Sequence, residues 1–465
     1  MTESAFPIKH EWGGHGRGRY VVSARPIKRG EVVLEALPYA LAPKLPSLTC
    51  TRCFRFHPPS STSSPTSPSP SSSELQTSQF ADVSDDEDED EDRVGAAQVS
   101  STSSTKLHPC SLGCGAAFYC SPAEEADDRP LHGLECVAWR RVREVGASME
   151  LTESEEAELR LVFRIAARHH RETLDHRFAD DEAEAEEADD EDEDKSNKKK
   201  RKKKGMDNMQ NELTEPTYDD VLRLCSNREK RPIEVRQSSF SWEMTFWRRV
   251  VQRVVAPLAQ TSESSAGRGV AWSKYDFVEL ICKNLCNGFG LRGAGGQCYA
   301  YGVYPAASYF NHSCYPNICR IEQDAGQAAP GRRRQRFVAL VDIPAGRELS
   351  LSYIDGSKPT EQRRLALSSI YFFHCMCARC ETSSSTSGGK GKGGKTNNNN
   401  KKKRHKDDYV QRFVCGSCTK NNGRGVMYPV SPTHNRCNLC HRTAAVVAHQ
   451  RGPKTVARPA TTQQQ

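Results

Sequence analysis

Nineteen cysteines, most of them with one to three residues between neighbours, constrain this chain more than any other feature of its sequence. Short C-x-C and C-x2-C groupings favour zinc sites over disulfides when thiols are kept reduced. The chain has no run of 18 or more apolar residues that could cross a bilayer, and no apolar stretch follows a basic start as in a secretory signal. We therefore expect a zinc-binding protein that is neither membrane-spanning nor secreted.

The length of 465 residues leaves room for two or three domains, separated by low-complexity segments. Ser, Pro and Thr dominate one segment, which also contains the acidic run Asp85–Asp92, and acidic and basic blocks adjoin in another. Such compositions bury too little apolar surface to offset the entropy of ordering. The net charge of +7 hides this segregation of acids and bases. We predict disorder over 58–107, 180–213, 382–407 and 446–465.

Hydrophobic periodicity predicts helices between these segments. Leu159, Val162 and Phe163 fall on one helical face, and Thr152 and Glu155 form a possible capping box before it. Two further helices are expected, over 247–254 and around 277–287. Alternating β-branched residues around Gly30 and within 337–353 predict short strands. The combination indicates an α+β fold.

Two cysteine groups lie in the C-terminal part of the chain. Two C-x2-C pairs are spaced as in a four-cysteine zinc ribbon: Cys415, Cys418, Cys437 and Cys440. The alternative is four unliganded thiols, but two such pairs at this separation rarely coincide by chance. A triplet, Cys375, Cys377 and Cys380, offers three thiolates and has no fourth ligand nearby. Its fourth ligand must come from elsewhere in the chain.

A third group lies in the N-terminal half and could hold two zinc ions if its ligands interleave: Cys50, Cys53, Cys110, Cys114, Cys120, His132 and Cys136. This pattern resembles the MYND finger, in which the first and third ligand pairs share one zinc ion and the second and fourth share the other. Two departures stand out. Cys110 and Cys114 have three residues between them instead of two, and Glu124 occupies the position of a family cysteine.

The most specific motif is Asn311-His312-Ser313-Cys314-Tyr315-Pro316-Asn317, which carries the N-H-S-C-x-P-N signature of SET domains. The segment 348–355 resembles their second signature, and Gly16-Arg17-Gly18 resembles their G-x-G start. A MYND finger between that start and the N-H-S-C motif is the arrangement of the SET and MYND (SMYD-type) protein-lysine methyltransferases. The resemblance covers most of 12–381, and the C-terminal ribbon has counterparts in arthropod and fungal relatives.

The resemblance implies roles for individual residues. One set matches positions that contact S-adenosylmethionine: Gly16, Arg17, Gly18, Asn287, Ser308, Asn311 and His312. Tyr353 matches the catalytic tyrosine, and Tyr371 and Phe373 match aromatics beside the cofactor and the lysine channel. Cys314 matches the cysteine that joins the post-SET triplet, and so becomes the missing fourth ligand. Glu124 would be the fourth zinc ligand of the first finger site, with Cys50, Cys53 and Cys120.

These residue types suit methyl transfer from a sulfonium to an amine. The reaction needs an uncharged amine, alignment of nitrogen, methyl carbon and sulfur, and exclusion of water. An aromatic channel beside a cationic sulfonium disfavours the ammonium form of a lysine, whose pKa is near 10.4 in water. We expect a protein-lysine methyltransferase acting on histones. The alternatives are an inactive SET/MYND adaptor that binds partner peptides, and a nucleic-acid binder that uses the ribbon and the basic run.

The expected organisation is a SET β core split in sequence by a MYND zinc finger and a helical insert, then closed by a post-SET zinc loop and a zinc ribbon. Its parts are 1–49 and 287–355 for the SET domain, 50–140 for the finger, 141–286 for the helical insert, 356–381 for the post-SET loop and 408–445 for the ribbon. The basic run Lys198–Lys204 predicts nuclear localisation, with the cytoplasm as a second location; the alternative is a solvated charge run.

Expected partners are a protein substrate with a target lysine, histone tails included, and peptides at the finger. No membrane partner is expected, and nucleic acid is left open. The five cysteines outside the zinc groups are expected to be buried thiols: Cys225, Cys282, Cys286, Cys298 and Cys319.

Overall fold

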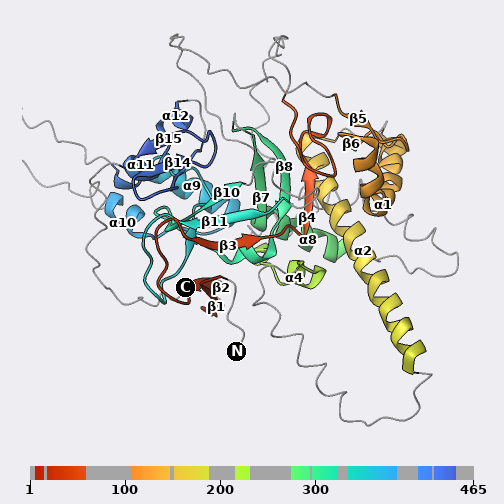
Figure 1. Cartoon of the computed structure of the whole chain (residues 1–465), viewed down its shortest axis with the longest axis horizontal. Helices are drawn as coiled ribbons and strands as arrows, with labels where there is room; N and C mark the ends of the chain where they lie inside the picture. The colour runs from red at the N-terminus through yellow and green to blue at the C-terminus, as the bar shows by residue number, and fades with distance from the viewer. Residues whose placement is uncertain are drawn as a thin grey trace, which may run out of the picture.

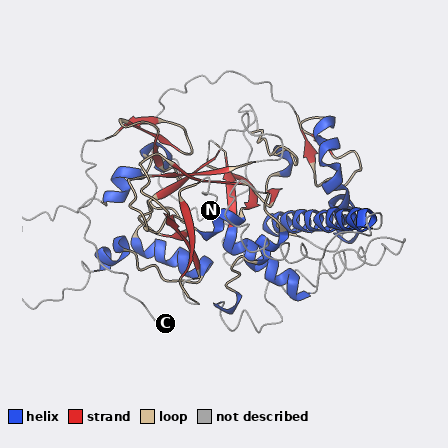
Figure 2. Ribbon diagram, turned by 60° about the horizontal axis from the view of Figure 1, so that its bottom comes forward, coloured by secondary structure: helices blue, strands red, loops and turns tan. Residues whose placement is uncertain are grey.

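A computed structural model of the chain describes residues 6–14, 18–58, 106–146, 151–187, 215–230, 274–293, 296–322, 333–384, 407–420 and 424–446. Several expectations lie outside the described residues: the acidic run Asp85–Asp92, the basic run Lys198–Lys204 and the helix over 247–254. The described part mixes helices and small sheets, so the α+β class is confirmed (Figures 1 and 2).

The strands form several small sheets. The strands are β1 Ile8–Trp12, β2 Arg19–Ser23, β3 Val32–Ala36, β4 Ala40–Pro43, β5 His108–Pro109, β6 Phe118–Tyr119, β7 Gly288–Arg292, β8 Cys298–Val303, β9 Asn311–His312, β10 Ile318–Glu322, β11 Gln335–Ala339, β12 Ser350–Leu351, β13 Met427–Pro429, β14 His434–Cys437 and β15 Thr443–Ala445. The three-stranded sheets have the orders β10-β11-β3, β4-β8-β7 and β13-β14-β15, and β1-β2 and β5-β6 are antiparallel pairs. Strands β9 and β12 pair in parallel.

The helices lie around these sheets. They are η1 Pro46–Leu48, α1 Pro122–Gly146, α2 Glu153–Glu187, α4 Tyr218–Leu222, η3 Arg228–Lys230, α8 Lys274–Asn287, η5 Pro305–Tyr309, α9 Thr360–Tyr371, α10 Ala378–Ser384, α11 Asp408–Phe413 and α12 Gly416–Thr419. None of the helices in the described ranges is long and apolar enough to cross a membrane.

Helix α2 begins at the predicted capping box. The Thr152 backbone N–H donates to Glu155 Oε2 (2.8 Å), and the Glu155 backbone N–H donates to Thr152 Oγ1 (3.3 Å). The apolar face that starts at Leu159 is buried. The helix continues to Glu187, whereas the sequence predicts disorder from residue 180. Residues 181–187 are Glu and Ala apart from one Asp, and the high helix propensity of Glu and Ala accounts for this extension.

Figure 1 shows the finger elements β5, β6 and α1 at one end of the molecule beside α2, with the C-terminal elements α11, α12, β14 and β15 at the other end. Strands β3, β4, β7, β8, β10 and β11 lie between them, and the last turns of α2 extend away from this body (Figures 1 and 2). The main buried cluster is continuous from the finger through α2 to the strands, so finger and core share one hydrophobic interior.

A buried ionic network joins the finger to α2. Arg164 of α2 donates to Asp128 Oδ1 (2.7 Å) and Glu135 Oε2 (3.1 Å) of α1. The Tyr119 hydroxyl donates to Asp128 (3.1 Å), and Glu135 Oε2 lies 3.3 Å from His132 Nδ1. Since His132 Nδ1 is held by this carboxylate, its Nε2 is left for a metal ion. The network therefore orients His132 of the finger through Arg164 of α2, a helix outside the finger.

Glu158 is a buried carboxyl on α2. Its side chain is almost fully enclosed next to Asn284 of α8, and burial raises the pKa of Glu158 to about 8. An unfolded chain would ionise this group near pH 4.3. Its contribution to stability is therefore full below pH 4.3 and is lost as the pH rises toward 8.

We expect the melting temperature of the wild-type protein to fall between pH 6.5 and 8, because the free energy of unfolding loses about 1.4 kcal/mol per pH unit from this group. Glu158→Gln removes the ionisation and should flatten the decline in a zinc-containing buffer. Glu156→Gln is the matched control, because that neighbouring carboxylate is 46% exposed. Parallel pH profiles for the wild type and Glu158→Gln would show that Glu158 ionises freely in the folded protein.

Candidate functional site

The N-H-S-C-x-P-N segment is locked to the strand that precedes Tyr353. Asn311 and His312 in β9 pair in parallel with Ser350 and Leu351 in β12. The Asn317 side chain also binds the backbone before Tyr353 through both atoms of its amide. Its Nδ2 donates to the Glu348 carbonyl (2.8 Å), and its Oδ1 accepts from the Ser350 N–H (2.8 Å). Segments far apart in sequence are thereby held in one register.

His312 fixes the backbone at Tyr353. Its Nδ1 accepts the Tyr353 backbone N–H (3.1 Å), and its Nε2 lies 3.3 Å from Cys314 Sγ. Since Nδ1 is an acceptor, the ring proton belongs on Nε2, where it can be donated to the sulfur. Burial lowers the pKa of His312 to about 4, so the neutral imidazole is the form present at pH 7. His312 is a structural link between the predicted cofactor strand, the tyrosine and the cysteine.

Three aromatic side chains gather beside His312. The His312 ring centroid lies 5.3 Å from that of Tyr353 and 5.9 Å from that of Phe373, and the Tyr353 and Tyr371 centroids lie 5.0 Å apart. Tyr371 ends α9, and Phe372 takes a left-handed conformation (φ 59°) that ends the helix before Phe373. The predicted catalytic and channel residues therefore come from two segments, 353 and 371–373, and meet beside His312 of a third.

The Tyr353 hydroxyl is held in a defined direction. It donates to the Phe310 carbonyl at 2.6 Å. Burial raises the pKa of Tyr353 above its usual value and raises the pKa of Tyr371 to about 12, so both phenols are protonated at neutral pH. Because the Tyr353 proton is used toward Phe310, the oxygen presents its lone pairs to any group that enters beside it.

The structure describes five of the seven predicted cofactor residues. Gly16 and Arg17 lie outside the described residues, and Gly18 takes a left-handed φ of 71° at the start of β2. Asn311 Nδ2 donates to Glu348 Oε1 (3.1 Å), the Ser308 hydroxyl donates to the Tyr304 carbonyl (3.0 Å), and Asn287 Nδ2 donates to the Cys225 and Lys283 carbonyls (both 2.8 Å). The amide oxygens of Asn287 and Asn311 are not used in these contacts.

Sequence reasoning missed several neighbours of the site. Glu348 supports Asn311, and the Asn227 side chain after α4 donates to the Tyr371 carbonyl (3.4 Å) and to Cys286 Sγ (3.7 Å). The prediction of buried thiols is wrong for Cys225, which is exposed, and for Cys286, which is half-buried. Both lie by the aromatic group, at a junction of α4 and α8 that no local pattern predicts.

The triplet acquires its fourth thiol from the N-H-S-C motif. Sulfur atoms within 4.8 Å of one another come from Cys314, Cys375, Cys377 and Cys380. Cys314 Sγ lies 3.8 Å from Cys375 Sγ and 3.5 Å from Cys380 Sγ. Tetrahedral zinc with Zn–S bonds near 2.3 Å sets its sulfur ligands about 3.8 Å apart, so this group fits zinc. The Arg363 guanidinium is buried against it, with Nη2 3.7 Å from Cys380 Sγ.

Two more groups fit zinc by the same measure. They are Cys110, Cys114, His132 and Cys136 in the finger, and Cys415, Cys418, Cys437 and Cys440 in the ribbon. The extra residue after Cys110 is accommodated by a turn in which Gly113 has φ 72°. In the ribbon, a Cβ on Gly425 would lie 2.6 Å from Cys437 Sγ, so only glycine fits beside the thiols.

The first finger site is less complete. Only Cys50, Cys53 and Cys120 form a group within 4.8 Å, and Glu124 is not part of it. Glu124 Oε2 is nevertheless buried without a hydrogen-bond partner, and burial, followed by the charge of Cys50, raises the pKa of Glu124. His57 approaches from the other finger segment, with Nε2 3.3 Å from Cys120 Sγ. That spacing is close to the 3.4 Å between His132 Nε2 and Cys114 Sγ in the second site.

We expect Glu124→Cys to slow the loss of one zinc ion to a chelator and to raise the melting temperature, because thiolate is a softer and more common structural zinc ligand than carboxylate. His57→Ala should speed the loss of the same ion, since it removes the nitrogen beside Cys120. His108→Ala is the matched control: His108 packs against the Tyr119 ring and belongs to no ligand group among the described residues. If Glu124→Cys releases zinc no more slowly than the wild type, the native site is already complete.

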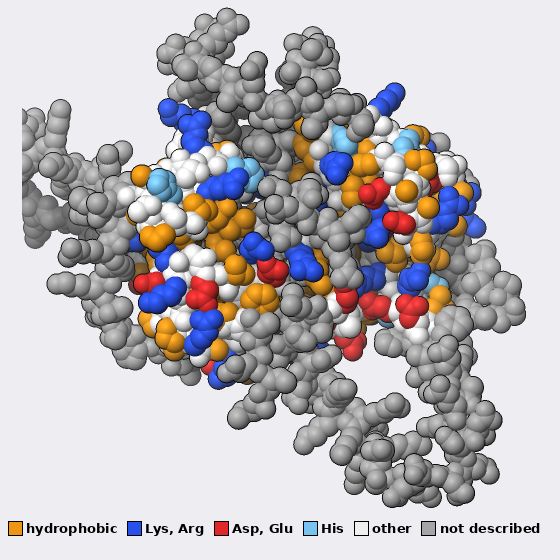
Figure 3. Space-filling view, viewed as in Figure 1, with side chains coloured by type: hydrophobic (Ala, Val, Ile, Leu, Met, Phe, Trp, Pro, Cys, Tyr) orange, Lys and Arg blue, Asp and Glu red, His pale blue; other side chains and the backbone are white. Residues whose placement is uncertain are grey.

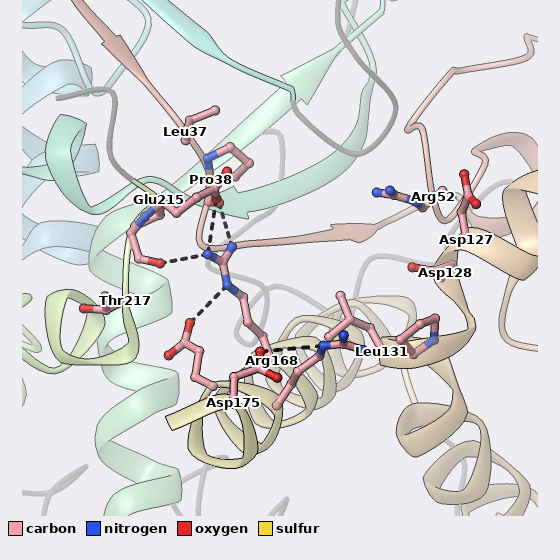
Figure 4. A pocket seen from close by; sticks show the side chains of 14 residues that line it. Leu37, Pro38, Arg52, Asp127, Asp128, Leu131, Arg168, Asp175, Glu215 and Thr217 are labelled. Atoms are coloured by element: carbon pink, nitrogen blue, oxygen red, sulfur yellow. Dashed lines mark hydrogen bonds and ion pairs between the residues drawn. The ribbon is translucent and has the colours of Figure 1, made fainter. Parts of the chain in front are cut away.

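A cleft of about 690 Å³ lies between the finger, the loop that joins β3 to β4, α2 and the segment before α4, away from the aromatic group. Figure 4 shows the Arg168 side chain crossing it. Arg168 donates to the Tyr39 carbonyl (2.7 Å) and the Pro216 carbonyl (2.8 Å) and pairs with Glu172 (3.2 Å). Arg168 is thus paired within the protein. On the face drawn in Figure 3, acidic and basic side chains of the described residues are interspersed.

The SET domain family model matches residues 18–354. A SET and MYND domain-containing protein of Dictyostelium discoideum is 38% identical over 104 residues, 22% of this chain and 23% of that protein. The histone-lysine N-methyltransferase SMYD3 of Homo sapiens is 36% identical over 108 residues, 23% of each chain, and ASHR2 of Arabidopsis thaliana is 35% identical over 108 residues, 22% of this chain and 27% of that one. The matched part spans about a quarter of these relatives. A solved SET domain of LSMT bound to lysine and AdoHcy aligns with TM-score 0.32 and 10% identity over 80% of this chain and 53% of that one.

Proposed function

Because the chain belongs to the SET-domain family, we propose that it is an S-adenosylmethionine-dependent protein-lysine N-methyltransferase with histone tails among its substrates. The observation that supports this most is the meeting of Tyr353, Tyr371 and Phe373 beside the Asn311–His312 strand. These residues come from two segments, 353 and 371–373, and lie partly buried against Leu367 and the post-SET thiols.

The residues near this group suit a cationic sulfonium cofactor. Aromatic faces attract cations, and the amide oxygens of Asn287 and Asn311 can accept hydrogen bonds from an ammonium group. We assign cofactor contacts to Gly16, Arg17, Gly18, Asn287, Ser308, Asn311 and His312. The cofactor, when bound, supplies an electrophilic methyl group on a positively charged sulfur.

The chain's own residues supply position and exclusion of water. The ring walls of Tyr353, Tyr371 and Phe373 restrain the four-carbon stem of a lysine so that its nitrogen points at the methyl carbon. Beside a positively charged sulfonium the ammonium form of that lysine is disfavoured, and its proton leaves to solvent before transfer. The Tyr353 oxygen, oriented by its bond to the Phe310 carbonyl, can accept a hydrogen bond from the neutral amine. No protein base is needed in the methyl-transfer step itself.

The second candidate is an inactive adaptor that binds peptides at the finger. The cleft beside the finger is the feature that favours it, with Leu37, Pro38, Pro130 and Leu131 among its lining residues. The internal pairing of Arg168 and the retention of Tyr353 and its aromatic neighbours weigh toward the enzyme. We also propose nuclear localisation from the basic run Lys198–Lys204, with the cytoplasm as a second location.

The test is transfer of a radiolabelled methyl group from the cofactor to a panel of core histones and to whole-cell lysate, followed by mass spectrometry of the labelled protein. Label on a lysine side chain is the expected result. Cofactor binding by calorimetry without transfer to any lysine would favour the adaptor. Labelling that is confined to non-histone proteins would keep the enzyme and remove histones as its substrates.

A further inference from the structure

The C-terminal ribbon packs on the SET core. Tyr409 and Phe413 of α11 are buried in one cluster with Cys319, Val338 and Leu340 of β10 and β11 and the segment that follows. Figure 1 shows α11 and β14 beside β10 and β11. Polar contacts supplement this packing: the Tyr315 hydroxyl donates to Asp408 (2.6 Å), and Asn438 Nδ2 donates to the Arg320 carbonyl (2.9 Å). The ribbon is therefore packed on the core through a buried apolar cluster and hydrogen bonds.

Arg379 joins three parts of the candidate site. It lies between the post-SET ligands Cys377 and Cys380, and its side chain is only 6% exposed. Its Nη1 donates to the Cys314 carbonyl (2.8 Å), and its Nη2 donates to the Gly356 carbonyl (2.8 Å). One planar guanidinium thus holds the N-H-S-C segment, the post-SET loop and the stretch that follows Tyr353.

The start of the ribbon, where Asp407 caps α11, holds Arg379 in turn. Asp407 accepts from Arg379 Nε with both oxygens (3.1 and 2.9 Å) and from its Nη2 (2.6 Å), and the Tyr409 ring lies under the guanidinium at 4.8 Å. A fork-shaped pair of this kind fixes direction as well as distance. Tyr409 also packs on the backbone after Tyr353: a Cβ on Gly356 would lie 2.5 Å from Tyr409 Cε1.

We propose that the ribbon is a positioning element of the methyl-transfer site, with Asp407, Tyr409 and Arg379 acting as a clamp on the segments that carry Tyr353 and Phe373. None of these three residues touches the reacting atoms, so they are positioning residues. Their effect on turnover rests on the proposed methyltransferase function, whereas their effect on the order of 353–380 does not.

The clamp has a physical basis in the composition of the post-SET loop. A short loop around a metal ion buries little apolar surface of its own. Its order therefore depends on the metal ion and on its contacts with neighbouring elements. Asp407 is 39% exposed, so screening limits its attraction to Arg379, and its main contribution is to hold the guanidinium in the orientation that serves two carbonyls. A displacement of about 1 Å at a reacting group can cost about 10²-fold in rate, so a small loosening has a large effect.

The test uses the full chain with Asp407→Ser. Asp407 also caps α11 by accepting the Tyr409 N–H (3.1 Å), and serine keeps a good N-cap while it removes the ion pair. We expect turnover to fall about 10-fold, by the same sensitivity to position, while cofactor affinity and zinc content stay at wild-type values. Amide hydrogen exchange over 353–380 should become faster. Glu361→Gln, which removes an exposed carboxylate from α9, is the control for charge alone.

Gly356→Ala disturbs the packing of Tyr409 on the backbone after Tyr353, because the added methyl group would displace the Tyr409 ring. It should produce the same faster exchange over 353–380. Wild-type exchange and wild-type turnover in both variants would overturn the clamp. If the wild-type chain methylates nothing, yet both variants loosen 353–380, the clamp stands and the proposed function fails. If the wild type is active and only Glu361→Gln lowers turnover, charge near the site matters and the clamp is wrong.

Discussion

Tyr353→Phe should lower methyl-transfer turnover about 10²-fold or more, the typical cost of losing a positioned catalytic group. The substitution removes the hydroxyl that donates to the Phe310 carbonyl at 2.6 Å and keeps the ring that packs beside His312 and Tyr371. The channel wall therefore stays in place, and only the oxygen that orients the amine is lost. Because the cofactor contacts assigned to Asn287, Asn311 and His312 are untouched, cofactor binding should stay nearly intact.

Turnover and calorimetric cofactor affinity, measured on the same preparations, separate these two effects. Tyr304→Phe is the matched control, because it also removes a buried tyrosine hydroxyl that donates to a backbone carbonyl, that of Arg333 at 2.7 Å. It should cost stability without a comparable loss of turnover. Unchanged turnover in Tyr353→Phe would remove Tyr353 from the mechanism, and an equal loss in both variants would indicate a general effect of destabilisation.

Only those parts of the site that lie within short sequence motifs could be predicted from the sequence. The ribbon cysteines follow from spacing alone, because two C-x2-C pairs can bring four thiols together whatever the intervening strands do. The link between Cys314 and a triplet about sixty residues later follows only from the family resemblance. No periodicity in this chain indicates that β9 and β12 pair in parallel, since both are two residues long.

What sequence reasoning missed consists mainly of contacts between elements. Arg379 and Asp407 flank a low-complexity segment, and nothing local indicates that they form an ion pair. The docking of the ribbon depends on a match between Tyr409 and Phe413 and the apolar residues Val338 and Leu340. Alternation predicts that a strand has two faces but not which face another module covers. At the end of α2 the acidic composition predicts disorder, whereas the helix propensity of Glu and Ala favours the helix that is observed.

Cys314→Ser should remove one zinc ion per chain and with it most of the methyl-transfer activity. Cys314 is fully buried, and its sulfur faces Cys375 and Cys380 at 3.8 and 3.5 Å. Three thiolates cannot close the tetrahedral shell of a structural zinc site, and the binding free energy of such an ion is also the free energy that orders its loop. Tyr371 and Phe373 lie in that loop directly before Cys375, so both channel aromatics should lose their fixed positions together.

Cys319→Ser is the control for this last variant. Cys319 is also buried and lies five residues further along, but it belongs to the cluster under the ribbon and to no metal-ligand group among the described residues. Atomic emission on purified protein should show one zinc ion fewer in Cys314→Ser and no loss in Cys319→Ser. Turnover should fall about 10²-fold in the first, as expected when reacting groups move by about 1 Å, and much less in the second. Full zinc content in Cys314→Ser would mean that the triplet takes its fourth ligand from another residue, and the loop would then be fastened to a different part of the core.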